Sequence, residues 1–303
     1  MLQDWASTDF GFHREEFPDA SIQQRGLIGW EQEYNQLGRG NFAGSIESLR
    51  LGGILIQRER FNVSVEQASV APKSSVNFVW MTSGWRVNGM SIAPETFGIW
   101  TGGAEHVAVN EGGSDSLLVT VDAHLFGPSP PRPFLAMVRG GDLAIAATGE
   151  WLRGLLVMAS DPKSPTGASP EVVATLALDR LSEILFRVVA PETRPGAEAP
   201  HIFRRVRELA SDRAGDPLSV AAICAATGVT AEALQRAFAD TVGLTPSAWL
   251  RIRRLNGARR DLRLARQRGD SVSAIAMKWG FWHLGRFSAY YREQFGEYPS
   301  ALR

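Results

Sequence analysis

The sequence predicts an α+β chain with a β-rich N-terminal part and an all-helical C-terminal part. Two observations lead to this fold class. From Leu27 to Val121, short apolar or alternating runs are separated by turn-forming residues every 8–12 residues or so, which is typical of antiparallel strands. Beyond Gly127 the apolar spacing becomes helical, and the end of the chain repeats one helix-turn-helix pattern.

The N-terminal strands are predicted from five apolar runs, and we assign residues 1–165 to this β-rich domain. The runs are Gly53–Ile56, Val76–Met81, Phe97–Trp100, Val107–Val109 and Leu117–Val121. No strand alternates with a clear helix, so we expect an antiparallel sandwich or barrel. Residues 1–25 are polar and irregular, and we expect them to form a loose arm.

Two helices are predicted before the C-terminal repeat. One covers Leu143–Met158, and the other begins at Ser169-Pro170-Glu171, which supplies a cap, a first-turn proline and an acid. Residues 166–190 are a candidate dimerisation helix, although the same helix could pack on its own domain. Its apolar residues make a narrow stripe, as in a coiled-coil seam, and the seam candidates are Leu178, Leu181, Leu185 and Val188. Residues 191–200 are rich in Pro, Ala and Glu and are predicted to form a linker.

The C-terminal repeat consists of two copies that stay in phase. Leu234, Phe238 and Gly243 lie 53 positions before Phe287, Tyr291 and Gly296, and the upstream residues match at an offset of 52. A repeat that gains one residue in its turn and keeps both flanks in phase is unlikely to arise by chance. Each copy predicts a capped short helix, a turn at glycine and a second helix that ends at another glycine.

The two units cover about 218–241 and 270–294 within a domain at 201–303, and a long helix joins them. This helix is predicted from Pro246 to about Gln267, which makes it roughly 30 Å long. One turn of DNA rises about 34 Å. A connector of this length can hold two recognition helices over successive major grooves.

The formal net charge of zero conceals a separation of charge along the chain. Residues 201–303 hold 17 Lys and Arg against 9 Asp and Glu, whereas residues 1–200 hold 15 against 23. A basic C-terminal domain predicts a polyanionic partner such as double-stranded DNA. The candidates for phosphate contacts, for which an ordinary solvated face is the alternative, are Arg251, Arg253, Arg254, Arg259 and Arg292.

Residues 201–303 resemble the AraC/XylS family of bacterial transcription regulators. The resemblance rests on Gly280-Phe281, on the run Phe287…Tyr291…Gly296…Pro299-Ser300 and on the weaker Gly243…Pro246-Ser247. It implies a sequence-specific regulator, an activator that works with RNA polymerase. By motif it places base-reading positions on Ala231, Glu232, Gln235 and Arg236, and then on His283, Leu284, Gly285, Arg286 and Ala289.

The same resemblance implies that the N-terminal part is an effector-sensing and dimerising domain with a cupin-like jelly roll. The residues Gly29-Trp30…Tyr34 together with Arg58–Asn62 are similar to sensor domains of the ethanolamine-utilisation regulator type. An effector pocket needs apolar walls and a few polar anchors. The candidates, of which the aromatic ones could also be ordinary core, are Trp30, Tyr34, Arg58, Arg60, Trp80, Trp85 and Trp100.

Other functional classes find less support in the sequence. The alternative to a regulator is a cupin-type metal-dependent enzyme, or a small-molecule-binding protein in which the helical domain is secondary. No two histidines lie closer than 18 residues, so we expect no metal, no cofactor and no catalytic residue. The single cysteine, Cys224, excludes a disulfide framework. The sequence shows no run of about 18 apolar residues and no signal-peptide core, so we expect a cytoplasmic protein without a membrane partner.

Overall fold

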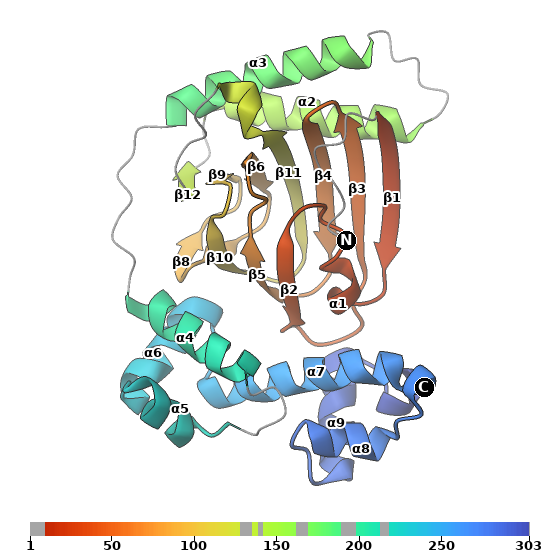
Figure 1. The fold of residues 1–303 in the computed structure, drawn as a ribbon, viewed down its shortest axis with the longest axis vertical. Coiled ribbons are helices and arrows are strands. Elements are labelled where there is room, and N and C mark those ends of the chain that lie inside the picture. The colour runs from red at the N-terminus through yellow and green to blue at the C-terminus, as the bar shows by residue number, and fades with distance from the viewer. Residues whose placement is uncertain are drawn as a thin grey trace.

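The computed structural model describes residues 10–127, 135–138, 142–161, 169–188, 198–212 and 218–302. In Figure 1 the β-sandwich lies in the middle, with two helices above it and the C-terminal helices below it. Two helices cover one face of a β-sandwich, and the C-terminal helices cover the opposite face. The predicted fold class, a β-rich N-terminal part followed by an all-helical C-terminal part, is confirmed.

Two antiparallel sheets make the sandwich. One has the strand order β1-β3-β4-β11-β6-β9-β12, and the other has the order β2-β5-β10-β7-β8. The strands are β1 (Gly11–Phe17), β2 (Glu31–Gln36), β3 (Gly44–Leu51), β4 (Ile54–Phe61), β5 (Val65–Val70), β6 (Ser75–Met81), β7 (Trp85–Val87), β8 (Met90–Ile92), β9 (Thr96–Thr101), β10 (Glu105–Asn110), β11 (Ser114–Asp122) and β12 (Leu135–Val138). The five predicted runs fall in β4, β6, β9, β10 and β11.

The expected loose arm is wrong for the part of residues 1–25 that the structure describes. Strand β1 pairs with β3 from Gly11↔Arg50 to Phe17↔Gly44. A short helix, α1 (Ala20–Gln23), follows, and the Asp19 carboxylate caps it by accepting from the Ser21 backbone N–H at 2.8 Å. Strand β1 is an edge strand and most of its residues face solvent, so most of its side chains are polar. Its sequence therefore lacks the apolar alternation from which a strand is predicted.

Helices α2 (Leu143–Ser160) and α3 (Pro170–Val188) cover the outer face of the larger sheet. Residues Leu181, Leu185 and Val188 are buried against this sheet, and Leu178 packs on the same core. The expectation that these four residues form a dimer seam is therefore wrong, because the apolar face of the sheet needs the stripe as its own cover. Residues 166–168 and 189–197, which include most of the expected linker, lie outside the described residues.

Within the described part of the chain, α2 is long and apolar enough to cross a membrane by length and composition. Its buried face contacts β1, β3 and β4. A helix that packs on the core of its own protein meets the same criteria, so this finding is weak evidence for a membrane span.

The C-terminal helices are α4 (Glu198–Asp212), α5 (Val220–Thr227), α6 (Ala231–Val242), α7 (Pro246–Arg268), α8 (Val272–Lys278) and α9 (Leu284–Phe295), followed by a 3₁₀ turn at Pro299–Leu302. The repeat is visible in how the helices end. Gly243 ends α6 with a φ of 70°, and Gly296 ends α9 with a φ of 77°. This left-handed conformation favours glycine, which explains two of the aligned positions.

Each helix-turn-helix unit has its own aromatic core. In the first unit, Phe203, Phe238 and Trp249 pack with ring centroids 4.9–5.4 Å apart. In the second unit, Phe287 and Tyr291 are completely buried. Gly257 lets the second unit approach α7 closely, because a Cβ at this position would lie 2.2 Å from the Trp279 ring.

Candidate nucleic-acid interface

The first recognition helix is α6, and its predicted base-reading residues all face outward. The Thr230 hydroxyl caps the helix by accepting from the Ala233 backbone N–H at 3.2 Å. Leu234 and Phe238 fix the opposite face by burial in the first core. The exposed residues are Ala231, Glu232, Gln235 and Arg236. Arg236 makes no ion pair with any residue that the structure describes, so its guanidinium is available to a ligand.

The second recognition helix is α9, which begins at Leu284. Its N-cap, His283, makes no side-chain capping hydrogen bond, unlike the matching Thr230 in the first unit. All five predicted readers are exposed, and they are His283, Leu284, Gly285, Arg286 and Ala289. Gly285 has no atom within 4 Å of the position that a Cβ would take, so the packing of the protein itself does not require glycine here. Arg286 has no acidic partner among the described residues.

Three of the predicted phosphate-contacting arginines lie at or near the surface. The Arg251 guanidinium lies over the Tyr290 ring at 5.1 Å, and that of Arg254 lies over Phe281 at 5.2 Å. Burial, together with the charge of Arg251, lowers the pKa of Arg254. Arg292 donates to the Tyr298 hydroxyl at 2.6 Å beside a hollow next to Ala289. These three side chains remain phosphate candidates.

The other two candidates, Arg253 and Arg259, face the β-sandwich. Arg253 forms an ion pair with Glu33 at 3.1 Å and donates to the Ser211 hydroxyl at 2.8 Å. Arg259 forms an ion pair with Asp19 and a second one with Glu297 at 2.8 Å. Both arginines are buried, so the expectation that they contact phosphate is wrong for this arrangement of the chain.

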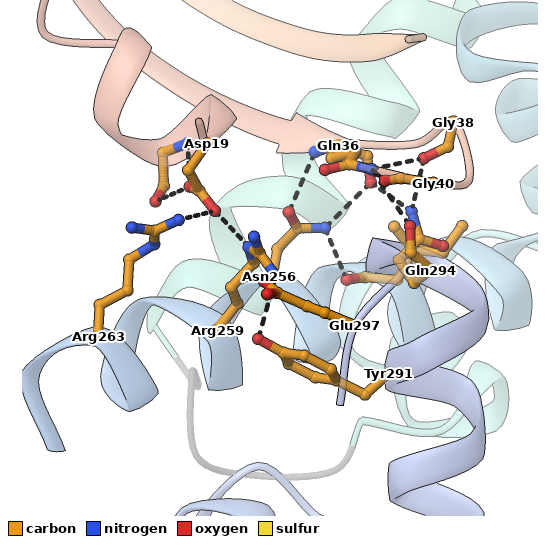
Figure 2. A network of polar contacts seen from close by, with 12 residues as sticks. Asp19, Gln36, Gly38, Gly40, Asn256, Arg259, Arg263, Tyr291, Gln294 and Glu297 are labelled. Atoms are coloured by element: carbon orange, nitrogen blue, oxygen red, sulfur yellow. Dashed lines mark hydrogen bonds and ion pairs between the residues drawn. The ribbon is translucent and has the colours of Figure 1, made fainter. Parts of the chain in front are cut away.

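Hydrogen bonds between side chains and the backbone hold α7 and α9 against the start of the chain, as Figure 2 shows. The Asn256 amide accepts from the Gln36 backbone N–H and donates to the Gln36 carbonyl, both at 3.1 Å. The Gln294 amide donates to the carbonyls of Gln36 at 3.0 Å and Gly38 at 3.2 Å. These bonds join segments more than 200 residues apart in the sequence, so they fix the position of the helical part on the sandwich.

Acidic residues of the sandwich neutralise several arginines across this interface. Burial alone would raise the pKa of Asp19, but the charges of Arg259 and Arg263 hold it below its ordinary value. Glu33 behaves in the same way between Arg253 and Arg207. The interpretation of the charge separation as a signal of DNA binding alone is therefore incomplete, because part of it joins the two halves of the protein.

An exposed aromatic side chain next to the second recognition helix is not among the residues predicted from the sequence. Trp282 lies in the turn before α9 and is 68% exposed. It directly precedes His283, and this position beside the predicted recognition residues could have marked it as a candidate for DNA contact. A large aromatic side chain at this place can pack on sugar or on a thymine methyl group.

The predicted effector residues separate into two groups in the structure. Trp30, Trp85 and Trp100 line a cavity inside the sandwich, and Tyr34 is buried beside it. The other three are on the opposite face of the larger sheet, so the expectation that they line this cavity is wrong. The Trp80 indole donates to the Ile145 carbonyl of α2 at 3.0 Å, Arg58 forms an ion pair with Asp115, and Arg60 forms one with Glu47 at 2.9 Å.

Trp80 lines a second cleft between β6, β9 and α2, with a volume of about 280 Å³. Val138 and Asp142 border this cleft and flank residues 139–141, which lie outside the described residues. The interior cavity brings together three of the predicted aromatic residues, whereas this cleft contains one of them. Among the described residues, no group of three His, Cys, Asp or Glu side chains is placed to hold a metal ion.

Comparisons with known proteins place the helical part of the chain among regulators. A family model described as a helix-turn-helix domain matches residues 223–303. The probable thc operon regulatory protein of Rhodococcus erythropolis is 38% identical over 106 residues, which cover 35% of this chain and 32% of that protein. The XylDLEGF operon transcriptional activator 3 of Pseudomonas putida is 29% identical over 153 residues, which cover 48% of this chain and 44% of that protein.

The matched segments span about a third to under half of the length of these curated relatives. Among solved structures, the AraC-like transcriptional activator CuxR aligns over 88% of this chain and 100% of its own, at 14% identity and a TM-score of 0.43. The family model describes the matched residues as a helix-turn-helix domain, and both relatives are named as operon regulators.

Proposed function

We propose that the whole protein is an effector-responsive, sequence-specific DNA-binding transcription regulator. The proposal starts from the C-terminal part of the chain, a helix-turn-helix domain that resembles those of the AraC/XylS family. One observation carries the proposal. Two recognition helices, each with an outward-facing arginine, are joined by α7, a helix of 23 residues. At about 1.5 Å per residue, α7 is about 34 Å long, which is close to one turn of DNA.

The chemistry of the two helices supports reading of base edges. Arg236 and Arg286 each present a guanidinium that no described acid neutralises, and arginine binds guanine bidentately in the major groove. Gln235 can recognise adenine in the same way. Glu232 lies on α6 with Gln235 and Arg236, and it can accept a hydrogen bond from cytosine. Arg251, Arg254 and Arg292 are then placed to contact phosphates, which position the domain without reading sequence.

The N-terminal sandwich supports a role in sensing. Its interior cavity lies between the two sheets, and the outer face of the smaller sheet carries the helical part. An effector can act only by binding one arrangement of these two parts more tightly than another. The buried ion pairs at Asp19 and Glu33 are the contacts that such a shift would strengthen or break.

The family resemblance adds a homodimer and contact with RNA polymerase to this proposal, with activation as the direction of regulation. Pairing through α3 would not use the buried residues Leu181 and Leu185. It would use the exposed apolar residues Val172 and Leu176 on the opposite face of the helix.

A selection experiment tests the proposed function. The full chain is mixed with fragmented DNA from its source genome, and the bound fragments are sequenced. We expect enrichment of a small set of promoter-proximal fragments that share a motif. We also expect log K for these fragments to fall linearly with log salt, with a slope of about −0.9 for each phosphate neutralised. No enrichment, or an affinity that does not change with salt, would reject the function.

A further inference from the structure

The cavity inside the sandwich is small and has aromatic walls. Its volume is about 40 Å³. Trp30, Trp85 and Trp100 line it together with the polar side chains of Glu59 and His106. The remaining lining residues are Leu27, Gln32, Gln67, Val79, Met81, Val87, Ala108, Ser116 and Leu118.

All three tryptophans of the cavity carry an unsatisfied hydrogen-bond donor. The indole nitrogens of Trp30, Trp85 and Trp100 are buried and have no acceptor among the described residues. An indole N–H can only donate, so it needs an acceptor that the protein does not supply here. Buried polar groups are normally paired. The Gln32 amide oxygen and the His106 Nδ1 atom, which also line the cavity, are likewise unpaired among the described residues, so the cavity is suited to a ligand that both accepts and donates hydrogen bonds.

Two other buried tryptophans, Trp80 and Trp249, and the partly buried Trp279 have acceptors, so this lack of partners belongs to the cavity. The Trp80 indole donates to the Ile145 carbonyl at 3.0 Å. The Trp279 indole donates to the Asp261 carboxylate at 2.8 Å, and the Trp249 indole donates to Glu66. These three tryptophans, which lie away from the cavity, each have an acceptor within the protein, whereas the three that line the cavity have none among the described residues.

The charges around the cavity favour an uncharged ligand. No Arg or Lys lines it, so a buried anion would lack a counter-ion. His106 contributes no positive charge at neutral pH, because burial lowers its pKa to about 4. Burial raises the pKa of Glu59 to about 7, so at neutral pH its carboxyl carries less negative charge than an exposed one. It also accepts hydrogen bonds from Gln23 at 3.0 Å, Tyr34 at 2.9 Å and Gln67 at 3.3 Å.

We propose that this cavity binds a short, uncharged amide or alcohol whose oxygen accepts hydrogen bonds from the indole N–H groups that line it, those of Trp30, Trp85 and Trp100. An amide or hydroxyl oxygen has two lone pairs, so it pairs with at most two of the three indoles at a time. The proposal rests on the sensing role proposed above and names the class of effector. A cavity needs about 10–15 Å³ of this kind of volume to hold one water molecule, so this one admits a molecule of about three or four non-hydrogen atoms.

The cavity wall also reaches the interface with the helical part. Gln23, which donates to Glu59, belongs to α1, and the Asp19 cap of α1 holds Arg259 and Arg263. Gln67 of the cavity follows Glu66, whose carboxylate accepts from Trp249. Neighbouring residues in a strand point to opposite faces, so β5 presents one residue to the ligand and the next to the helical part.

Indole resonances provide the test. The full chain is labelled with ¹⁵N-tryptophan, and the signals are assigned with single Trp→Phe variants. Acetamide and ethylene glycol serve as uncharged probes, and acetate and ethylammonium serve as charged probes of similar size. We expect the uncharged probes to shift the Trp30, Trp85 and Trp100 indole signals in a saturable way, while the Trp80 and Trp279 signals stay in place. Trp100→Phe should weaken acetamide binding about 3- to 10-fold, because it removes one donor.

Two results would overturn the proposal. One is the absence of a saturable shift with either uncharged probe, which would mean that the cavity holds only water. The other is a saturable shift with acetate or ethylammonium alone, which would assign the cavity to a charged ligand. The outcome is independent of the proposed function, because the indole shifts are measured without DNA and the genomic selection is made without a probe.

Discussion

Asp19→Asn releases the helical part of the protein from the sandwich. The substitution keeps an oxygen that can cap α1, but it removes the charge that faces Arg259 and Arg263. Arg259 is then left buried with only the partly exposed Glu297 as a counter-ion. Removing one partner of a buried ion pair costs about 3–5 kcal/mol. We expect calorimetry to show two separate unfolding transitions where the parent chain shows one, and X-ray scattering to show a larger radius of gyration.

The control for this variant is Asp261→Asn. Asp261 forms an ion pair with Lys278 at 2.8 Å, but both residues belong to the helical part. Equal effects of the two substitutions on the radius of gyration would contradict the role given to Asp19.

The stabilisation that Asp19 provides should also depend on pH. Its pKa in the folded chain is lowered below the ordinary value of 3.8. The contribution is therefore fully present above about pH 4 and is lost as the pH falls through the folded pKa. Asp19→Asn should lack this acid-dependent step.

Arg286→Ala should lower specific DNA binding by about 1–3 kcal/mol, which is roughly 5- to 150-fold in affinity. The reason is that Arg286 lies in the first turn of α9, is exposed and has no acidic partner among the described residues, so a guanine is its best available ligand. Arg236→Ala should have a smaller effect of the same kind, because α6 has fewer strong readers around it. Fluorescence anisotropy with a selected fragment and with a scrambled one measures both affinities.

Arg187→Ala is the matched control for these two variants. Arg187 lies on α3, on the opposite side of the sandwich from the helical part, and pairs with Glu183. It should leave both affinities unchanged. If Arg286→Ala lowered binding to the selected and the scrambled fragment equally, then Arg286 would be a phosphate contact and not a base reader.

The helical part could be predicted closely because its signals are local. A cap such as Thr230 and a left-handed glycine such as Gly243 act within one helical turn, so they can be recognised without knowledge of the rest of the fold. The exposed faces of α6 and α9 follow from the same periodicity, because Leu234 and Phe287 fix the buried side of each helix.

The direction in which an apolar or charged face points was harder to predict. The apolar residues of α3 could pack on the sheet of their own chain or on α3 of a second copy of the protein. The two possibilities can be distinguished only when the outer face of the larger sheet is known to be apolar and to need a cover. Arg259 has the sequence context of a phosphate contact, but its partner Asp19 lies 240 residues away. No local pattern reports such a distant contact.

The residues that line the cavity were hard to predict for a similar reason, because the sequence does not show which face of a sheet a side chain occupies. Trp80 in β6 and Trp100 in β9 belong to one sheet, yet Trp80 packs under α2 and Trp100 lines the interior. Both faces of this sheet are buried, so apolar residues occupy both sides and alternation does not reveal which side is inside.

The central claim is that two recognition helices at the ends of α7 read one face of a DNA duplex. Hydroxyl-radical footprinting of the full chain on a selected fragment tests it most directly. We expect two protected patches on the same face of the duplex, with centres about 10 base pairs apart, and loss of one patch in Arg286→Ala. A single protected patch, or two patches on opposite faces of the duplex, would contradict it.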